Sequence, residues 1–465
     1  MTETAFPSRP QPANSGVFRA YDIRGIVDRD FDADWVERLG RACGAYFLAR
    51  GSHRAVVGRD CRLTSPGFEE RMLAGLASTG IDVLSIGMVP TPVCYFAIRH
   101  LGYDAGVMIT ASHNPSEYNG FKIWAGKSTI HSGEIQALAQ RFEAGNFPQG
   151  QGIISAHDII PSYLSTVSAL VSLKRPVTVV LDGGNGAAGL VAQALLTRAG
   201  ATVIPLFCEP DGRFPNHHPD PVEEKNLGPL KAKVLETGAD CGIGLDGDGD
   251  RIGVVDEHAQ VVHGDRLLTI FARRVLQEKP GAAIIGDVKC SHLLFADIAK
   301  HGGRPLMSAT GHSLIKDRLL KENAALAGEM SGHMFFADHY YGFDDAPYAA
   351  LRLVEILSAT NTPLSSMLDD WPQTFVTPEL RVDCPDEIKF AVAEMARIEF
   401  AKKYTLEGDD GARLVFPDGW ALVRASNTQP ALVLRFEAES PERLAEIRAL
   451  VEIPLAAWIH ELSRS

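Results

Sequence analysis

Three aspartates alternate with glycines in the stretch DGDGDR, where the sequence brings its densest set of carboxylates together. Asp246, Asp248 and Asp250 can converge because glycine permits tight backbone turns between them. Carboxylate oxygens in this arrangement suit a hard divalent cation, and without one the three negative charges would repel each other. The sequence therefore predicts a Mg²⁺ or Ca²⁺ site in this loop.

The EF-hand is the main alternative for such a loop, because Glu257 stands where its twelfth ligand would be. The sixth position of an EF-hand requires glycine, however, and Arg251 occupies it here. The flanking segments CGIGL and RIGVV are short and apolar, which predicts strands rather than helices. These features exclude an EF-hand and favour a metal loop between two strands.

Ser112, in the segment TASHNP, stands between an apolar run and a series of turn-forming residues. It has no GxSxG elbow, and no Asp/His pair is spaced to take its proton. A serine that carries a phosphoryl group needs instead a metal and positive groups to balance the phosphate. His113 and Lys122 lie close in sequence. Taken alone the segment fits a surface turn equally well; beside the three aspartates, a phosphoserine site is favoured.

Two further segments offer groups that could bind a sugar and a phosphate. In GEMSGH, Glu329, Ser331 and His333 alternate, so an extended loop would point all three to one side. In RASNTQP, a guanidinium, two hydroxyls and turn N–H groups could form a phosphate cradle from Arg424, Ser426, Asn427 and Thr428. A polar strand edge and a capped hairpin are the structural alternatives for these two segments.

The turn GNGAAG at 184–189 favours a different class of protein. It is a literal GxGxxG between an apolar run and a helical pattern, with Glu209 about twenty residues further on, as in NAD-dependent dehydrogenases. A tight strand-to-helix turn also favours glycine without any nucleotide. A dehydrogenase would leave the three aspartates, Ser112 and the RASNTQP turn without a role.

Alternating strand and helix patterns must position these loops. The apolar runs at 55–60, 177–186 and 282–289 each end in Asp or Gly turn residues, which is typical of buried parallel strands. A helix is predicted over 32–51, and the segment from about 375 onward reads as an α+β module. The fold class is α/β with four domains: three related α/β units, with mixed or mostly parallel sheets, at 1–155, 156–260 and 261–372, and an α+β domain at 373–465.

Charge and composition restrict the partners. The 465-residue chain carries 58 acidic and 45 basic residues, a net charge of −13, which argues against general affinity for nucleic acid or membranes. No apolar stretch is long enough for a membrane helix, and the polar, Pro-rich start resembles a loose arm rather than a signal peptide. Seven cysteines without a CxxC pair indicate free thiols and a cytoplasmic location.

The four clusters, in this order, resemble those of the α-D-phosphohexomutase family over nearly the whole chain, from FRAYDIRG to RASNTQP. The resemblance implies four domains around a central cleft, a phosphorylated Ser112, and Mg²⁺ held by Asp246, Asp248, Asp250 and the Ser112 phosphate. It implies sugar recognition by Glu329 and Ser331, and phosphate binding by Arg424, Ser426, Asn427 and Thr428. Further cleft residues by the same resemblance are Tyr21, Arg24, Lys289 and His312.

The reaction implied by the resemblance interconverts hexose 1-phosphate and hexose 6-phosphate through a glucose or mannose 1,6-bisphosphate. Within the family, GEMSGH and RASNTQP are most similar to the loops of bacterial enzymes that accept mannose and glucose, with phosphoglucosamine mutase as the alternative. Arg24, Lys122 and Arg251 would stabilise charge on the transferring group. The general base is left open among His113, Lys122 and His333. The expected assembly is a monomer or a weak homo-oligomer, and closure of the fourth domain over the cleft is a further hypothesis.

Overall fold

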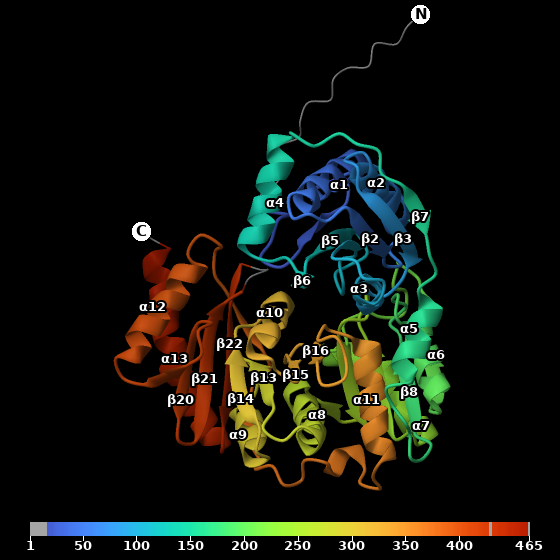
Figure 1. Cartoon of the computed structure of the whole chain (residues 1–465). Coiled ribbons are helices and arrows are strands. Elements are labelled where there is room, and N and C mark those ends of the chain that lie inside the picture. Colours follow the sequence, from blue (N-terminus) through green and yellow to red (C-terminus); the bar gives the residue numbers. More distant parts are fainter. Residues whose placement is uncertain (1–15, 427–429, 464–465) are drawn as a thin grey trace, which may run out of the picture. The chain divides into compact units, whose positions relative to one another are not determined.

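The computed structural model describes residues 16–426 and 430–463, which form two compact units. Unit 1 contains the chain up to Tyr163 together with Asp211–Pro215, and unit 2 contains Leu164–Pro210 and the chain from Asn216 onward. Within the described ranges the strands form four sheets, one in unit 1 and three in unit 2 (Figure 1). This arrangement agrees with the predicted four-domain α/β fold, and the predicted loose arm at 1–15 lies outside the described residues.

Unit 1 is built on a mixed sheet in the order β1-β5-β4-β2-β3-β7, with β6 paired to β5. Strands β2, β3, β4 and β7 are parallel, whereas β5 runs antiparallel to β1, β4 and β6. Helices α1, α2 and α4 lie on one side of this sheet and α3 on the other (Figure 1). The elements are β1 (Ile23–Ile26), α1 (Ala33–Leu48), β2 (Arg54–Arg59), α2 (Ser65–Ala77), β3 (Asp82–Met88), α3 (Thr91–His100), β4 (Ala105–Ile109), β5 (Tyr118–Ala125), β6 (Ser128–Thr129), α4 (Gly133–Ala144) and β7 (Ile154–Ala156).

The predicted helix over 32–51 corresponds to α1. Asp32 caps it by accepting a hydrogen bond from the backbone N–H of Trp35, which satisfies one of the free N–H groups of the first turn. Its apolar residues recur at three- and four-residue steps, and Trp35, Val36 and Leu39 are buried in the core of unit 1.

The first two sheets of unit 2 run in the orders β12-β11-β10-β8-β9 and β14-β13-β15-β16. The predicted strands at 177–186 and 282–289 are β8 and β13, and both lie between parallel neighbours. The elements are α5 (Ile160–Ser168), which begins at the end of unit 1, β8 (Thr178–Asp182), α6 (Gly189–Ala199), β9 (Thr202–Leu206), η1 (Glu224–Leu227), α7 (Gly228–Thr237), β10 (Cys241–Leu245), β11 (Ile252–Asp256), β12 (Val261–Val262), α8 (Gly264–Glu278), β13 (Ala283–Asp287), α9 (His292–Lys300), β14 (Arg304–Ser308), α10 (His312–Glu322), β15 (Leu326–Gly328), β16 (Met334–Phe336), α11 (Ala346–Ser358) and η2 (Leu364–Ser366).

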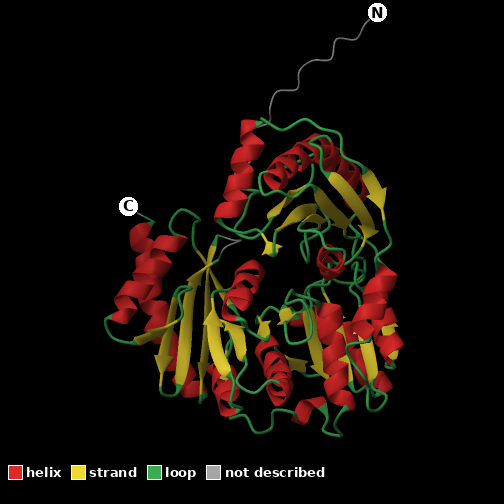
Figure 2. Ribbon diagram, viewed as in Figure 1, coloured by secondary structure: helices red, strands yellow, loops and turns green. Residues whose placement is uncertain are grey.

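The third sheet of unit 2 is antiparallel, as the predicted α+β module requires. Its order is β17-β22-β21-β20-β19, with β18 also paired to β22, and two helices pack on it (Figure 2). The predicted turn at 417–419 joins β20 to β21, and the predicted turn at 426–430 lies partly outside the described residues. The elements are β17 (Phe375–Val376), β18 (Leu380–Asp383), α12 (Lys389–Ala401), β19 (Thr405–Glu407), β20 (Ala412–Phe416), β21 (Gly419–Ala425), β22 (Ala431–Ala438) and α13 (Pro441–Leu462).

The motif loops follow the carboxyl ends of strands. Ser112 comes after β4 in unit 1; in unit 2, GNGAAG follows β8, DGDGDR follows β10 and Glu329 follows β15. Because parallel strands end at the same edge of a sheet, each sheet gathers its loops at one edge, which is where α/β proteins bind ligands. In the part of the chain that the structure describes, no helix combines the length and the apolar character needed to cross a membrane.

Candidate active site

In unit 1, Ser112 has a backbone conformation that is rare for residues other than glycine. Its φ is +51°, in the left-handed region, and the residue is buried. Its N–H donates to the Thr110 hydroxyl at 2.9 Å, and its own Oγ lies 3.1 Å from Nδ1 of His113. Strained residues of this kind persist only where their surroundings over-determine them, and they cluster at functional sites.

The group that over-determines this loop is Arg62, which the sequence analysis missed. Its guanidinium is fully buried and donates to the carbonyls of Ser112 and Asn114 at 2.8 and 2.6 Å. It also donates to the carbonyls of Pro115 and Tyr118 at 2.6 and 2.9 Å, while Nε faces Asp60 at 3.2 Å. One side chain thus binds four loop carbonyls and fixes the path of the serine loop.

Replacing Arg62 with Met should therefore lower the free energy of unfolding of unit 1 by about 3–5 kcal/mol, because it leaves Asp60 buried without its charged partner and four carbonyls without this donor. Denaturant unfolding followed by tryptophan fluorescence measures the change. Arg71→Met is the matched control, because Arg71 lies on α2 with its side chain 46% exposed in a surface ion pair with Glu37. Equal stability of the two variants would contradict the claim that Arg62 holds the serine loop in place.

The other predicted site residues of unit 1 differ in how closely they are tied to the serine loop. Arg24 on β1 donates to the Asn114 side chain at 2.8 Å and pairs with Asp22, so it is tied to the loop. Lys122 is buried on β5 opposite Met108 of β4, the strand that leads to Ser112. Tyr21 is half-buried just before β1.

In unit 2, the DGDGDR loop joins β10 to β11, which pair antiparallel up to Leu245 and Ile252. The predicted strand flanks are therefore correct. Asp246, Asp248 and Asp250 are each at most 1% exposed, and each offers an oxygen within 4.8 Å of the others. One oxygen of Asp246 also accepts the N–H groups of Asp250 and Arg251 at 3.0 and 3.1 Å, which closes the loop.

Three buried carboxylates so close together repel each other unless a cation balances them. Their oxygen-only donor set fits a hard divalent ion such as Mg²⁺. Asp220, Asp246 and Asp250 also affect Arg251: burial alone would lower its pKa, but these carboxylates raise it. The arrangement can therefore hold a cation and keep a permanent guanidinium charge beside it.

The GNGAAG turn packs against this acidic loop. A Cβ added at Gly186 would lie 2.7 Å from the carbonyl oxygen of Gly247, and the N–H of Ala187 donates to that same carbonyl at 3.0 Å. A dinucleotide needs the N–H groups at the start of the helix for its pyrophosphate. Here the aspartate loop occupies the N–H of Ala187, and its close approach requires glycine at position 186.

His217 supports the same turn from behind. Its Nε2 lies 3.0 Å from a carboxylate oxygen of Asp182, the last residue of β8. Burial lowers the pKa of His217, but the hydrogen bond and charge of Asp182 outweigh burial and raise it above 6.5. The folded state therefore favours the protonated form.

The stabilisation from His217 should be complete below pH 6.5 and should decrease as pH rises through the raised pKa of the folded state. Wild type should exceed His217→Gln in melting temperature at low pH, with a difference that shrinks toward alkaline pH. Thermal scans across that range test this. A difference that grows with pH would contradict the assignment.

The GEMSGH segment is not the extended loop that its alternation suggested. Residues 329–333 form a turn between β15 and β16, because the N–H of Glu329 donates to the His333 carbonyl at 2.9 Å and that of Gly332 to the Glu329 carbonyl at 3.0 Å. The turn still brings polar groups together: Ser331 Oγ and His333 Nε2 lie 3.4 and 3.9 Å from Glu329 Oε2.

The Glu329 carboxylate is buried, and its Oε1 accepts the N–H of Gly311 at 2.7 Å. Burial and the nearby Asp287 raise its pKa. Lys289, after β13, lies 3.3 Å from Glu379 and 3.9 Å from Asp287, and these carboxylates raise its pKa against the effect of burial. Lys289 thus lies among carboxylates that balance its charge.

Arg424 on β21 is held by an acid that the sequence did not indicate. Its Nε donates to Asp410 at 2.9 Å, and the same oxygen of Asp410 accepts the N–H of Thr310 at 3.0 Å. Ser426 closes the start of the turn, since its N–H donates to the Ala431 carbonyl at 2.9 Å. The predicted Asn427 and Thr428 lie outside the described residues.

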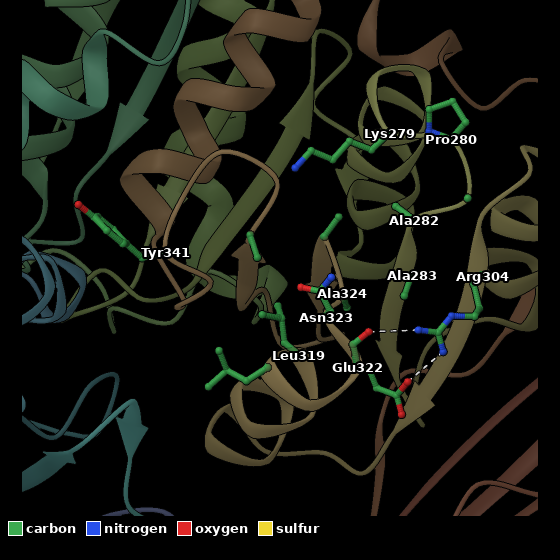
Figure 3. Close-up of a pocket in the computed structure, with 14 residues that line it drawn as sticks. Lys279, Pro280, Ala282, Ala283, Arg304, Leu319, Glu322, Asn323, Ala324 and Tyr341 are labelled. Carbon is green, nitrogen blue, oxygen red and sulfur yellow. Dashed lines mark hydrogen bonds and ion pairs between the residues drawn. The ribbon is translucent and has the colours of Figure 1, made fainter.

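A pocket elsewhere in unit 2 contains none of the predicted site residues (Figure 3). It has a volume of about 500 Å³ and is lined mainly by residues 279–283 and 319–325. Ala282 and Ala283 mark the amino end of β13, whereas the motif loops follow carboxyl ends. The Arg304 guanidinium on its wall is paired with Glu322 at 2.9 Å. We do not assign the chemistry to this pocket.

The chain matches sequence models of four successive domains. They are described as phosphoglucomutase/phosphomannomutase alpha/beta/alpha domains I, II and III, at residues 15–149, 161–260 and 263–375, and a C-terminal domain at 379–452. A Pseudomonas putida protein named phosphomannomutase/phosphoglucomutase is 47% identical over 440 residues, covering 94% of this chain and 95% of the relative. A Neisseria gonorrhoeae phosphoglucomutase is 44% identical over 437 residues, covering 93% and 95%.

Solved structures give the same similarity. A phosphoglucomutase/phosphomannomutase family protein from Burkholderia thailandensis superposes with a TM-score of 0.89 at 41% identity, covering 95% of this chain and 97% of that one. A structure described as a phosphomannomutase from Thermus thermophilus gives a TM-score of 0.79 at 26% identity, covering 96% and 100%.

Proposed function

Because the chain belongs to the phosphoglucomutase/phosphomannomutase family, whose four domain models it matches in order, we infer that it interconverts hexose 1-phosphates and hexose 6-phosphates. It is an isomerase whose net reaction changes which hydroxyl of the sugar carries the phosphate. The observation that carries this conclusion is the near-full-length identity of 45–47% to enzymes named for this activity. A strained, clamped serine in unit 1 and a three-carboxylate loop in unit 2 supply the groups it needs.

The first transfer breaks the bond between phosphorus and Oγ of phosphorylated Ser112 and forms one between phosphorus and the free sugar hydroxyl. The hydroxyl proton passes to a base, the leaving serine oxygen takes up a proton, and the product is a hexose 1,6-bisphosphate. After the bisphosphate turns around, the serine hydroxyl gives up its proton, and its oxygen forms a bond to the phosphorus of the other phosphate. The ester bond between that phosphorus and the sugar oxygen breaks, and the sugar oxygen takes up a proton. The enzyme then carries a phosphoserine again, so phosphate is neither gained nor lost.

Charge stabilisation is the main catalytic task in such a transfer. Mg²⁺ bound by Asp246, Asp248 and Asp250, with the Ser112 phosphate as a further ligand, would neutralise the charge of the phosphoryl group. Arg24 and Arg251 add positive charge. Arg24 is suited to this because its contact with Asn114 already ties it to the serine loop.

Substrate binding is divided between two sites. Arg424, Ser426, Asn427 and Thr428 bind the phosphate that stays in place, and Asp410 orients Arg424 from behind at 2.9 Å. Glu329 and Ser331 bind sugar hydroxyls in either orientation, with Lys289 and His312 beside them. Tyr21 is a further proposed substrate-binding residue.

The contacts of His333 bear on which residue acts as the general base. His333 Nε2 accepts a hydrogen bond from Arg251 at 3.0 Å, so its lone pair is already engaged. That contact favours Lys122 or His113 over His333 as the group that takes the proton from the sugar hydroxyl.

Mannose and glucose phosphates are the proposed substrates, because GEMSGH and RASNTQP are most similar to the loops of enzymes acting on both. Assays of glucose 1-phosphate, mannose 1-phosphate and glucosamine 1-phosphate with Mg²⁺ and a trace of bisphosphate test this choice. Turnover of glucosamine 1-phosphate alone would favour phosphoglucosamine mutase. We also propose a cytoplasmic monomer or weak homo-oligomer; sedimentation velocity measures the assembly state.

A further inference from the structure

An aspartate just before α11 lies at the centre of a buried network behind the GEMSGH turn. Asp344 is fully buried. Its Oδ1 accepts from Nζ of Lys316 at 2.9 Å, and its Oδ2 lies 3.2 Å from Nδ1 of His333 and 3.4 Å from Nδ1 of His312. The rings of the two histidines stack, with centroids 5.5 Å apart. One carboxylate therefore faces both histidines that border the sugar loop.

The other nitrogen of His333 shows where that ring carries its proton. Nε of Arg251 donates to Nε2 of His333 at 3.0 Å. A guanidinium can only donate, so Nε2 must be the unprotonated, accepting nitrogen. The proton of the neutral imidazole then belongs on Nδ1, where it faces Oδ2 of Asp344 at 3.2 Å and Oδ1 of Asp250 at 3.7 Å.

Nδ1 of His333 and Oδ2 of Asp344 are complementary, because one can donate a hydrogen bond and the other can accept it. Among the described residues, Nδ1 of His333 and Oδ2 of Asp344 are both buried side-chain atoms without an aligned hydrogen-bond partner. They lie 3.2 Å apart, so a small rotation of the ring satisfies both at once. Lys316 balances the charge of Asp344 from the opposite side, which keeps the carboxylate ionised and accepting.

We propose that Asp344 is a positioning residue for phosphoryl transfer. It holds the proton of His333 on Nδ1, which leaves Nε2 to accept from Arg251 and so fixes the orientation of the guanidinium. The two terminal NH₂ groups of Arg251 are then available to the transferring phosphoryl group. Only the contact of Arg251 with the phosphoryl group rests on the proposed function. The series of contacts from Asp344 through His333 to Arg251 does not.

The isosteric change Asp344→Asn tests this series of contacts, because it replaces the acceptor that faces Nδ1 of His333 with a donor. Lys316 can only donate, so it takes the amide oxygen, and the amide NH₂ turns toward Nδ1 of His333. The proton of His333 must then move to Nε2, where Arg251 can no longer donate. We expect kcat to fall by about 10- to 100-fold, the usual effect of removing a group that orients a functional side chain from behind, with little change in KM.

The matched control is Asp345→Asn at the next position. Asp345 caps α11 by accepting the N–H of Tyr348 at 2.8 Å and also accepts the hydroxyl of Tyr340 at 2.9 Å. This variant should keep the helix cap, because asparagine caps a helix about as well as aspartate, and it should keep both kcat and the state of His333. A purely structural role for Asp344 would make the two variants behave alike.

Nitrogen-15 NMR of histidine-labelled protein at alkaline pH gives a readout that is independent of activity, with His333 assigned by comparison with His333→Gln. Wild type should show the proton on Nδ1, and Asp344→Asn should show it on Nε2. A wild-type His333 protonated on Nε2 overturns the proposal, and that measurement does not depend on the folding of Asp344→Asn. Wild-type kcat in a folded Asp344→Asn enzyme overturns it as well. Failure of the proposed reaction would leave the wild-type spectrum as expected, so the two failures are distinguishable.

Discussion

Replacing Ser112 with Ala is expected to reduce kcat by at least about 10³-fold, because no other group can accept the phosphoryl group between the two transfers. The purified variant should also lack the phosphate that wild type carries on the peptide containing residue 112. Steady-state assays and phosphopeptide mapping measure both effects.

Ser128→Ala is a suitable control, because Ser128 lies on a short strand of the same unit and has no predicted role. Alanine at 112 also removes the contact of Oγ with His113 at 3.1 Å. Melting temperatures of the two variants should therefore be compared before kcat. Full activity of a folded Ser112→Ala enzyme would exclude the serine as the phosphate carrier.

Replacing Asp248 with Asn should lower activity by about 10²- to 10³-fold, because the change removes a charged oxygen from a set of three and weakens cation binding. The same substitution has an opposite effect on the metal-free protein. It relieves repulsion among three buried carboxylates, so the melting temperature in EDTA should stay equal to that of wild type or rise.

Thermal scans with and without Mg²⁺ separate these effects. Mg²⁺ should stabilise wild type by mass action and should stabilise Asp248→Asn much less. Glu236→Gln on α7 is the control, because Glu236 is an exposed acid paired only with Lys233 in the described contacts. An equal Mg²⁺ shift in Asp248→Asn and wild type would place the cation elsewhere.

Some of the site could be predicted because its chemistry depends on residues that are adjacent in sequence. Asp246, Asp248 and Asp250 are separated only by glycines, so their convergence follows from local backbone geometry. The apolar runs on either side predicted β10 and β11 correctly for the same reason. Helix α1 could be predicted in the same way. Its capping residue and its periodic apolar residues all lie within one segment of the sequence.

The residues that were missed act across long stretches of chain. Arg62 donates to carbonyls about fifty residues further on, and backbone carbonyls carry no sequence signal. Asp410 reaches Thr310 across 100 residues, and Asp344 meets Lys316 only because α10 and the start of α11 are neighbours. Such contacts depend on tertiary packing, which local patterns do not encode.

Two segments show how tertiary context overrides a local pattern. The alternation in GEMSGH predicted an extended loop, but pairing of β15 with β16 requires a turn within five residues. The segment 211–215 groups with unit 1 although both of its flanks belong to unit 2. There the Arg62 guanidinium lies over the ring of Phe214 at 5.2 Å, a contact that sequence order gives no reason to expect.

The central claim is that the phosphate on Ser112 is the group delivered to the sugar. The most direct test is a single-turnover experiment with enzyme carrying ¹⁸O-labelled phosphate on Ser112, mixed with unlabelled hexose 6-phosphate and Mg²⁺. We expect the label to leave the serine peptide and to appear in hexose bisphosphate and hexose 1-phosphate at least as fast as steady-state turnover. Label that stays on Ser112 while sugar phosphate is interconverted would contradict it.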